Sequence, residues 1–380
     1  MKIITVVGAR PQIIKAAAIS RAIENNFPQI EEIILHTGQH YDQNMSEVFF
    51  EELNIPKPTI NLNVGSSSHG KQTAKMIEQI EDVLVQYKPN AIVVYGDTNS
   101  TLASAVAASK IHVPIVHIEA GLRSFNKKMP EEINRIMCDH ASTLLFSPTQ
   151  TGYQNLINEG FSKTISKKAT ADCPNIYHCG DVMYDNSIHF SKLSEQKSSI
   201  LSDLGIENNP FILATVHRND NTDDPQKLNE IFSSFLKLTE GNNIQLILPL
   251  HPRTIKMKET LLNETVKEQL SNSSLIKIIP PASFLDIISL EKNASLIITD
   301  SGGVQKEAYF FKKPCIILRP QTEWVEIVEA KSAVIADTNQ EKILNAVNNY
   351  LHNENLAFPP VFGDGKAAEF ILNEMVNQFS

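Results

Sequence analysis

Acidic side chains follow directly after buried apolar runs in the first half of the chain. Asp97 comes after the run AIVVYG, Glu119 after PIVHI, and Glu131 lies downstream in the segment MPEEINR. Side chains at the carboxyl ends of parallel strands meet in the crevice outside the sheet. These carboxylates therefore predict an active site. The alternatives are structural: Asp97 as a helix N-cap, and Glu131 and Glu132 as first-turn carboxylates favoured by the helix dipole.

The second half of the chain has its own polar residues at the ends of apolar runs. His217 follows FILATV, and the segment SLIITDSGGVQKEA joins an apolar run to a predicted helix. Amides of Ser301, Gly302 and Gly303 at a helix N-terminus predict an anion cradle, where a diphosphate can approach the backbone. Glu307, about one turn on, could hold vicinal hydroxyls such as a ribose diol. The alternative is a tight turn without a ligand.

The first predicted turn differs from a glycine-rich phosphate loop. The opening VVGARPQIIK contains only Gly8 and then places Arg10 and Lys15 where a GxGxxG loop has glycines. The residues alone leave open what a first turn with two cations in place of glycines holds. The alternative for Arg10 is a surface ion pair.

Short continuous apolar runs separated by helical segments position these residues. The runs in the first half are KIITVVGA, EEIILHTG, TINLNVG, AIVVYGD, PIVHIEAG, TLLFSPT and NIYHCGD; those in the second half are PFILATVHR, IQLILPLHP, LIKIIP, SLIITDSGG, PCIILRP and SAVIAD. Runs of this kind are typical of parallel strands covered on both faces. The pattern predicts an α/β fold with two Rossmann-like, doubly wound domains facing a cleft. We place them at residues 1–170 and 175–360, with a linker in the polar region from about Ser162 to Ser202.

Composition excludes several classes of protein. The 380 residues are 42% hydrophobic and carry a net charge of −9, which disfavours a nucleic-acid surface. No apolar run approaches the ~20 residues that span a bilayer, and the first strand is too short for a signal peptide. The four cysteines have no CxxC spacing, so we predict neither a disulfide framework nor a metal site. The chain reads as a reduced cytoplasmic protein.

Eight segments, in this order, resemble the non-hydrolysing UDP-N-acetylglucosamine 2-epimerases: GARPQIIK, TGQHYD, GDTNST, HIEAGLRS, MPEEINR, HR after the linker, LPLHPR and DSGGVQKEA. The resemblance runs from Lys2 to about Glu326. It implies a fold similar to that of B-type glycosyltransferases. It also implies that a C-terminal helix, residues 361–380, packs back on the first domain, and that the protein is a homodimer.

The resemblance also implies roles for individual residues. Asp97, Glu119, Glu131 and His217 match the family's catalytic positions. Ser301, Gly302 and Gly303 would hold the diphosphate and Glu307 the ribose. Arg10 and Lys15 would reach the same phosphates from the opposite domain, and Arg135 would bind substrate. No metal or other cofactor is needed.

The implied reaction explains the number of acidic groups. Direct removal of the C2 proton of a sugar would leave an unstabilised carbanion. Expelling UDP from C1 while C2 loses its proton gives a glycal instead, and re-addition inverts C2. This sequence requires acid/base groups on both faces of the sugar and a dry site. Rival functions are a glycosyltransferase, a hydrolysing epimerase and a non-enzymatic UDP-sugar binder.

Some positions differ from the main branch of the family. Gln12, the segment YDQNMS and the segment TEWVE resemble a sub-branch that acts on UDP-2,3-diacetamido-2,3-dideoxyglucuronate. A uronate requires a cation or oriented donors near its carboxylate. Arg319 is a candidate, and Lys127 and Lys128 are also near the site motifs in sequence. The alternative is that Arg319 pairs with Glu323 or Glu326. The altered segment HRNDN also leaves open whether a second UDP-N-acetylglucosamine molecule activates this protein.

Overall fold

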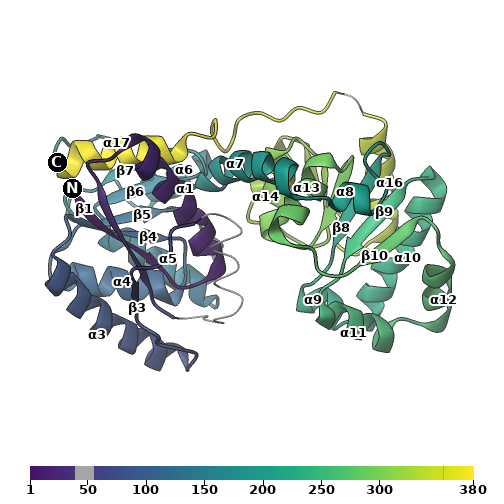
Figure 1. The fold of residues 1–380 in the computed structure, drawn as a ribbon, viewed down its shortest axis with the longest axis horizontal. Helices are drawn as coiled ribbons and strands as arrows, with labels where there is room; N and C mark the ends of the chain where they lie inside the picture. Colours follow the sequence, from purple (N-terminus) through teal and green to yellow (C-terminus); the bar gives the residue numbers. More distant parts are fainter. Residues whose placement is uncertain (39–54, 354) are drawn as a thin grey trace. The chain divides into compact units, whose positions relative to one another are not determined.

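The computed structural model describes residues 1–38, 55–353 and 355–380. These residues form two compact units, Met1–Ile188 with Pro360–Ser380, and His189–Pro359. Each unit contains a parallel β-sheet with helices around it, so the predicted pair of doubly wound α/β arrays is confirmed (Figure 1). The segment YDQNMS lies outside the described residues.

The sheet of the first unit contains seven parallel strands in the order β3-β2-β1-β4-β5-β6-β7. Their bounds are β1 Lys2–Val7, β2 Glu31–His36, β3 Ile60–Asn61, β4 Ala91–Tyr95, β5 Ile115–Ile118, β6 Leu144–Ser147 and β7 Asn175–His178. The helices are α1 Arg10–Asn26, α3 His69–Tyr87, α4 Asn99–Lys110, α5 Pro130–Ala141, α6 Gln150–Asn158 and α17 Ala367–Phe379. The helix α7, Val182–Lys197, contains the division between the two units.

The sheet of the second unit contains six parallel strands in the order β10-β9-β8-β11-β12-β13. Their bounds are β8 Phe211–Thr215, β9 Gln245–Pro249, β10 Ile276–Ile279, β11 Leu296–Thr299, β12 Cys315–Ile317 and β13 Ala333–Ile335. The helices are α8 Ile200–Asp203, α9 Asn219–Thr222, α10 Pro225–Asn242, α11 Pro252–Leu261, α12 Glu264–Asn272, α13 Phe284–Asn293, α14 Gly302–Phe310, α15 Val325–Glu329 and α16 Gln340–Leu351.

The division between the units lies later in the chain than the sequence predicted. The predicted boundary at 170–175 assigned residue 175 onward to the second domain, but β7 pairs with β6 from Leu144↔Asn175 to Ser147↔His178. The seventh strand extends the first sheet because its backbone completes that ladder. The polar region 162–202, expected to contain a linker, includes α7 and also β7, which is the run NIYHCGD counted with the first half.

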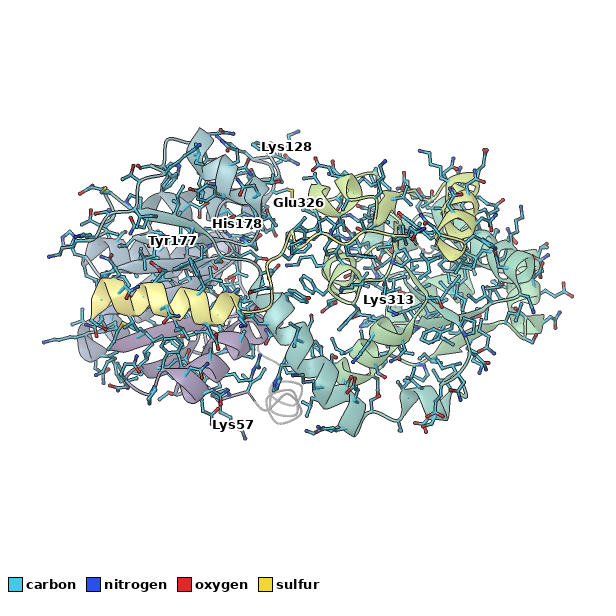
Figure 2. All side chains as sticks on the ribbon, turned by 90° about the horizontal axis from the view of Figure 1, so that it is seen from above. Lys57, Lys128, Tyr177, His178, Lys313 and Glu326 are labelled. Atoms are coloured by element: carbon cyan, nitrogen blue, oxygen red, sulfur yellow. The ribbon has the colours of Figure 1, made fainter. Side chains whose placement is uncertain are left out.

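The last helix, α17, belongs to the first unit. It packs on α1, and the two chain ends lie close together in Figure 1. Its apolar side includes Ile371, Leu372 and Met375, all fully buried. The Phe370 ring lies edge-on to Tyr177 of β7, 5.7 Å between centroids, and Figure 2 shows Tyr177 beside this helix (Figure 2).

Both sheets place their strand order reversals at the predicted chemical segments. In the first sheet the order reverses between β1 and β4, and in the second between β8 and β11. Ligands of open α/β sheets bind outside the carboxyl ends of strands at such reversals. The residues that follow these four strands are Gly8–Arg10, Gly96–Thr98, Val216–Arg218 and Asp300–Gly303. Within the described residues, no helix combines the length and apolar character needed to cross a bilayer.

Candidate active site

Gly8 directly follows β1, at a position where no side chain fits. A Cβ atom there would lie 2.0 Å from Ser100 Oγ and 2.4 Å from Thr37 Oγ1. The glycine therefore lets α4 approach β1 closely, which is a packing role. Arg10 begins α1 and is exposed.

Gln12 joins the ends of β1 and β4. Its Oε1 accepts a hydrogen bond from Gly8 N at 2.9 Å, and its Nε2 donates to Tyr95 O at 2.8 Å and to Thr101 Oγ1 at 3.0 Å. The side chain is buried. An ionised glutamate at this position could not donate to the Tyr95 carbonyl, so an amide is the group that satisfies both partners.

Asp97 is held at the end of β4 by α5. Arg135 contacts Asp97 Oδ2 through Nε at 2.9 Å and through Nη2 at 2.8 Å, and Asn134 Nδ2 donates to the Asp97 carbonyl at 2.8 Å. Burial raises the pKa of Asp97 and nearby Glu119 adds to this, while Arg135 and Lys15 oppose it. A carboxyl with a raised pKa in a polar site is suited to proton transfer.

Glu119 has an unusual backbone conformation. Its φ is +73°, in the left-handed region that non-glycine residues seldom adopt. Its carboxylate forms an ion pair with Lys15 from α1, and both side chains are nearly buried. Gly96 leaves room for this pair, because a Cβ there would lie 3.0 Å from Glu119 Oε2. Backbone strain of this kind is concentrated at functional sites.

One face of the helix α5 positions the side chains of this cluster. Glu132, Arg135 and Asp139 follow at spacings of three and four residues, which places them on the same side. Glu132 accepts from the amides of Ser124 at 2.8 Å and Phe125 at 2.9 Å and pairs with Arg135 at 2.6 Å. Glu132 is a first-turn carboxylate of α5, as its alternative has it, and it also holds the loop that precedes the helix.

Glu131 lies on the same helix but is exposed. It is the second residue of α5, so the helix N-terminus stabilises its negative charge. The structure thus brings Asp97, Glu119, Lys15 and Arg135 together and keeps Glu131 at the solvent-facing start of the helix beside them.

In the second unit, Asp300 joins the ends of β8 and β11. Its carboxylate, fully buried, accepts from the amides of His217 at 3.1 Å and Arg218 at 3.0 Å and from Asn221 Nδ2 at 3.1 Å. The His217 ring is half exposed, and its Nδ1 lies 3.3 Å from Asp300 Oδ1. A carboxylate behind an imidazole fixes the ring's orientation, as in other acid/base sites.

Ser301, Gly302 and Gly303 form the turn from β11 to α14. Ser301 Oγ caps the helix by accepting from Val304 N at 3.4 Å. Neither glycine has a positive φ, and a Cβ would meet nothing closer than 3.7 Å at Gly302 and 3.8 Å at Gly303. Glycine weakens a helix, and the fold needs neither Gly302 nor Gly303 for backbone conformation or for space. A ligand that approaches the backbone would account for glycine at both positions.

Glu307 lies one turn into α14, as predicted, and faces Glu291 of α13. Glu291 is fully buried, and neither of its oxygens has a hydrogen-bond donor among the described residues. Burial, followed by the Glu307 charge, raises the pKa of Glu291 well above its usual value. Glu291 is therefore the protonated member of the two.

Arg319 is already paired. Its Nη1 and Nη2 donate to the two oxygens of Glu323 at 2.9 and 2.8 Å, the arrangement that the alternative reading predicted. Next to this pair, Trp324 Nε1 donates to the Gly302 carbonyl at 3.0 Å, and Lys306 Nζ lies 4.2 Å from the centroid of the Trp324 ring. The segment TEWVE thus contacts the turn that contains the two glycines.

Two buried carboxylates, Asp139 and Asp300, were absent from the predicted site residues. Each accepts hydrogen bonds from backbone amides that follow a neighbouring strand, and each thereby holds that strand end in place. For Asp139 the available signal was its spacing, four residues after Arg135 and seven after Glu132. For Asp300 it was the position next to Ser301.

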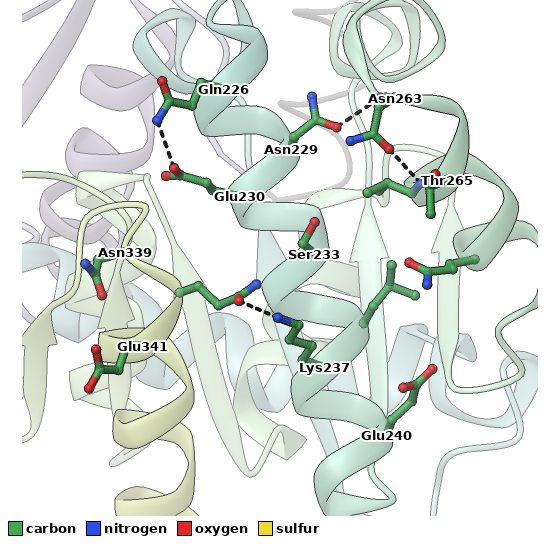
Figure 3. A pocket seen from close by; sticks show the side chains of 14 residues that line it. Gln226, Asn229, Glu230, Ser233, Lys237, Glu240, Asn263, Thr265, Asn339 and Glu341 are labelled. Carbon is green, nitrogen blue, oxygen red and sulfur yellow. Dashed lines mark hydrogen bonds between the residues drawn. The ribbon is translucent and has the colours of Figure 1, made fainter.

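A polar groove of about 920 Å³ lies elsewhere in the second unit, between α10, α12 and α16 (Figure 3). Its side chains largely pair with one another: Lys237 Nζ donates to Gln340 Oε1 at 2.6 Å and Gln226 Nε2 to Glu230 Oε1 at 3.0 Å. None of the predicted site residues lines it. Among the described residues, no group of three or more His, Cys, Asp and Glu side chains is placed to hold a metal ion.

Comparison with known proteins places these features in one family. The family model described as UDP-N-acetylglucosamine 2-epimerase matches residues 21–376. A UDP-N-acetylglucosamine 2-epimerase homolog of Methanococcus maripaludis is 47% identical over 378 residues, covering 99% of this chain and 100% of the relative. The UDP-2,3-diacetamido-2,3-dideoxy-D-glucuronate 2-epimerase of Pseudomonas aeruginosa is 45% identical over 371 residues, with 98% of each chain covered.

Solved structures of UDP-GlcNAc 2-epimerases are also similar to this chain. The Methanocaldococcus jannaschii UDP-GlcNAc 2-epimerase in complex with UDP-GlcNAc and UDP is similar with a TM-score of 0.81 and 40% identity, over 99% of both chains. An α,α-trehalose-phosphate synthase of Burkholderia xenovorans has a TM-score of 0.59 at 11% identity over 99% of both chains, which shows likeness of fold alone.

Proposed function

Because the chain belongs to the UDP-N-acetylglucosamine 2-epimerase family, we propose that it is a non-hydrolysing epimerase that interconverts UDP-N-acetylglucosamine and UDP-N-acetylmannosamine. The observation that carries the proposal, beyond the family itself, is the pair Gly302 and Gly303. Their lack of a side chain serves neither backbone conformation nor packing, and a diphosphate at the start of α14 accounts for both.

The nucleotide is held by the second unit in this proposal. The amides of Ser301, Gly302 and Gly303 bind the diphosphate, and Glu307 binds the ribose hydroxyls. Arg10 and Lys15 supply further positive charge to the phosphates when the substrate is in place. Binding of the phosphates by Lys15 requires it to exchange its partner Glu119, which frees that carboxylate for proton transfer.

The proton-handling groups of the reaction are Asp97, Glu119 and Glu131. One removes the C2 proton as the C1–O bond to UDP breaks, and another returns a proton to the opposite face of the glycal as UDP re-adds. The raised pKa of Asp97 favours its acting in the protonated form. His217, oriented by Asp300, stabilises the leaving phosphate, and Arg135 sets the position of Asp97.

The test of the proposal is incubation with UDP-N-acetylglucosamine alone in D2O, followed by NMR. Deuterium at C2 of a sugar still attached to UDP is the expected result. Free sugar would instead support a hydrolysing epimerase, and an unchanged substrate would support a glycosyltransferase or a binding protein.

A second experiment examines bond breaking at C1. Substrate with 18O in the bridging position is expected to scramble the label into non-bridging β-phosphate positions during turnover. Retention of the bridging label while C2 inverts would contradict elimination of UDP.

The second candidate substrate is UDP-2,3-diacetamido-2,3-dideoxyglucuronate, because the P. aeruginosa relative bears that name at 45% identity. The bidentate pair of Arg319 with Glu323 favours the neutral sugar, since Arg319 is already neutralised. Comparing kcat/KM on the two sugars decides between them. A preference of ~10³-fold for the uronate that disappears in Arg319→Met would establish the uronate as substrate.

We further propose that the enzyme works in the cytoplasm and as a homodimer. The support is the family to which it belongs. Sedimentation of the purified chain at several concentrations measures the oligomeric state, and a monomer at every concentration would contradict the dimer.

A further inference from the structure

The His117 ring lies between the two strand ends that carry the catalytic carboxylates. Its side chain is fully buried at the end of β5. Nδ1 lies 2.7 Å from Asp139 Oδ1 of α5, and Nε2 lies 2.8 Å from the carbonyl oxygen of Gly96 at the end of β4. The proposed mechanism assigns no role to this histidine.

The partners of His117 determine its protonation. A carbonyl oxygen can only accept, so Nε2 must carry a proton. Asp139 is also an acceptor, because its other oxygen receives the Gly121 amide at 3.1 Å and Arg123 Nη2 at 2.7 Å. Both ring nitrogens therefore donate, and the ring is an imidazolium.

The charges around the ring support this state. Burial acts to lower the pKa of His117, but Cys138 and the Asp139 carboxylate outweigh it and raise that pKa well above the usual value. The two positive groups, His117 and Arg123, face Asp139 and Glu159, the latter 2.6 Å from Arg123 Nε. His117, Arg123 and Asp139 are buried, Glu159 lies at the surface, and the four charges balance.

The two hydrogen bonds of His117 reach the backbone on either side of the site. Gly96, which accepts from Nε2, directly precedes Asp97. Asp139, which accepts from Nδ1, holds the amide of Gly121, two residues after the strained Glu119. One ring therefore connects the backbone of Asp97 to the turn that orients Glu119.

We propose that His117 is a permanently protonated positioning residue that sets the separation of the Asp97 and Glu119 carboxylates. The inference rests on the proposed epimerase function for its catalytic consequence, but the charge of the ring does not. A misplacement of about 1 Å in a reacting group can cost ~10²-fold in rate, so a fixed connection of this kind bears directly on kcat.

The charge is tested first, by NMR of the full chain with 15N-labelled histidine. Of the eleven histidines, one ring is expected to keep both N–H protons from pH 6 to pH 9, and its signal is expected to be absent in His117→Gln. The groups that face it are Asp139 and Cys138 from α5 and the Gly96 carbonyl from β4, with Arg123 beyond Asp139. If every ring is neutral at pH 8, the inference is overturned.

The positioning role is tested with a graded pair of variants. His117→Gln can keep one of the two donated hydrogen bonds, so its kcat is expected to fall by ~10²-fold. His117→Phe keeps neither bond, so its kcat is expected to fall by a larger factor. The Kd for UDP, measured by calorimetry, is expected to stay within about twofold. His112→Gln, at an exposed turn before β5, is the matched control and is expected to keep full activity.

Comparing the loss of kcat with the folded fraction separates an effect on positioning from an effect on protein stability. The rates are expressed per folded molecule, with the folded fraction measured by circular dichroism at the assay temperature. A loss of kcat that merely follows the folded fraction would overturn the positioning role, and His117→Gln decides the matter if His117→Phe does not fold. A wild-type protein without epimerase activity would refute the proposed function, while the NMR result would still decide the charge.

Discussion

At the scale of single residues, this protein uses buried carboxyl groups in two distinct ways. Asp139 and Asp300 are surrounded by hydrogen-bond donors and hold strand ends in place. Glu291 instead faces another carboxyl group and must carry a proton. The environment of each carboxyl group, rather than its chemical type, determines its state.

Glu131→Gln tests the proton-transfer role of the exposed carboxylate on α5. Glutamine keeps the shape and some hydrogen bonding but cannot transfer a proton, so kcat is expected to fall by about 10²-fold or more with KM little changed. Steady-state kinetics with UDP-N-acetylglucosamine measures both. The control is Glu329→Gln in α15, which is not one of the site residues and is expected to leave kcat and KM unchanged. An unchanged kcat in Glu131→Gln would remove Glu131 from the mechanism.

Glu291→Gln tests the buried carboxyl pair through stability. The pKa of Glu291 is raised in the folded state, so the folded protein binds more protons than the unfolded chain above the usual glutamate pKa. Wild-type stability should therefore fall as pH rises through that range. Glutamine removes this cost, and Tm is expected to rise by roughly 2–4 °C per kcal/mol recovered.

The pH dependence makes the Glu291 prediction specific. The gain in Tm is expected at pH 8 and should vanish near pH 4, where glutamate is protonated in both states. Thermal unfolding at several pH values measures it. A gain that is equal at pH 4 and pH 8 would show that charge is not its cause.

At the scale of elements, α5 and α17 each depend on a few side-chain contacts to the backbone. The inner face of α5 holds the ends of β4 and β5 through Arg135 and Asp139. The first turn of α17 is held by Asp185 of α7, which accepts from the amides of Ala367 at 3.2 Å and Ala368 at 2.8 Å. A distant carboxylate here does what a helix's own N-cap residue usually does.

Asp185→Ala tests this cap. Loss of the acceptor leaves two buried helix amides without a partner, so the free energy of unfolding is expected to fall by about 1–2 kcal/mol. Asp185→Asn keeps one acceptor oxygen and is the control; it should lose less, because burial raises the pKa of Asp185 to about 6 and the neutral amide avoids that charge. Urea unfolding measures both variants. An Asp185→Ala variant as stable as the wild type would show that the cap contributes nothing.

At the scale of the whole molecule, the two units divide the proposed chemistry. The first contains Asp97, Glu119 and Glu131, and the second contains the nucleotide cradle and His217. The chain has a single tryptophan, Trp324, which lies in the second unit and donates to the Gly302 carbonyl.

Trp324 is therefore placed to report on nucleotide binding at the turn proposed to hold the diphosphate. UDP is expected to change its fluorescence with a saturable dependence, and to stabilise the second unit by about 2.7 kcal/mol at 100 times Kd. Titration followed by thermal unfolding, both monitored by tryptophan emission, measures these effects. Trp324→Phe should lose the signal but still bind UDP by calorimetry. Calorimetric binding without any change in wild-type emission or Tm would place the nucleotide away from this turn.

The sequence by itself determined the two parallel sheets, the segments that end their central strands and the family. These features are local: continuous apolar runs specify strands buried on both faces, and each motif is a short stretch of chain. The pairing of Arg319 with Glu323 is one of the alternatives that the sequence leaves open.

Only the tertiary structure determines which of the polar side chains contact one another. Asp97 and Arg135 are 38 residues apart, and His117 and Asp139 are 22 apart, so their pairing depends on how α5 lies against the strand ends. The assignment of β7 to the first sheet depends on its ladder with β6, and the direction of the Glu119 side chain on a backbone φ of +73°. Such contacts arise from packing between distant segments, and the local pattern of the sequence does not contain them.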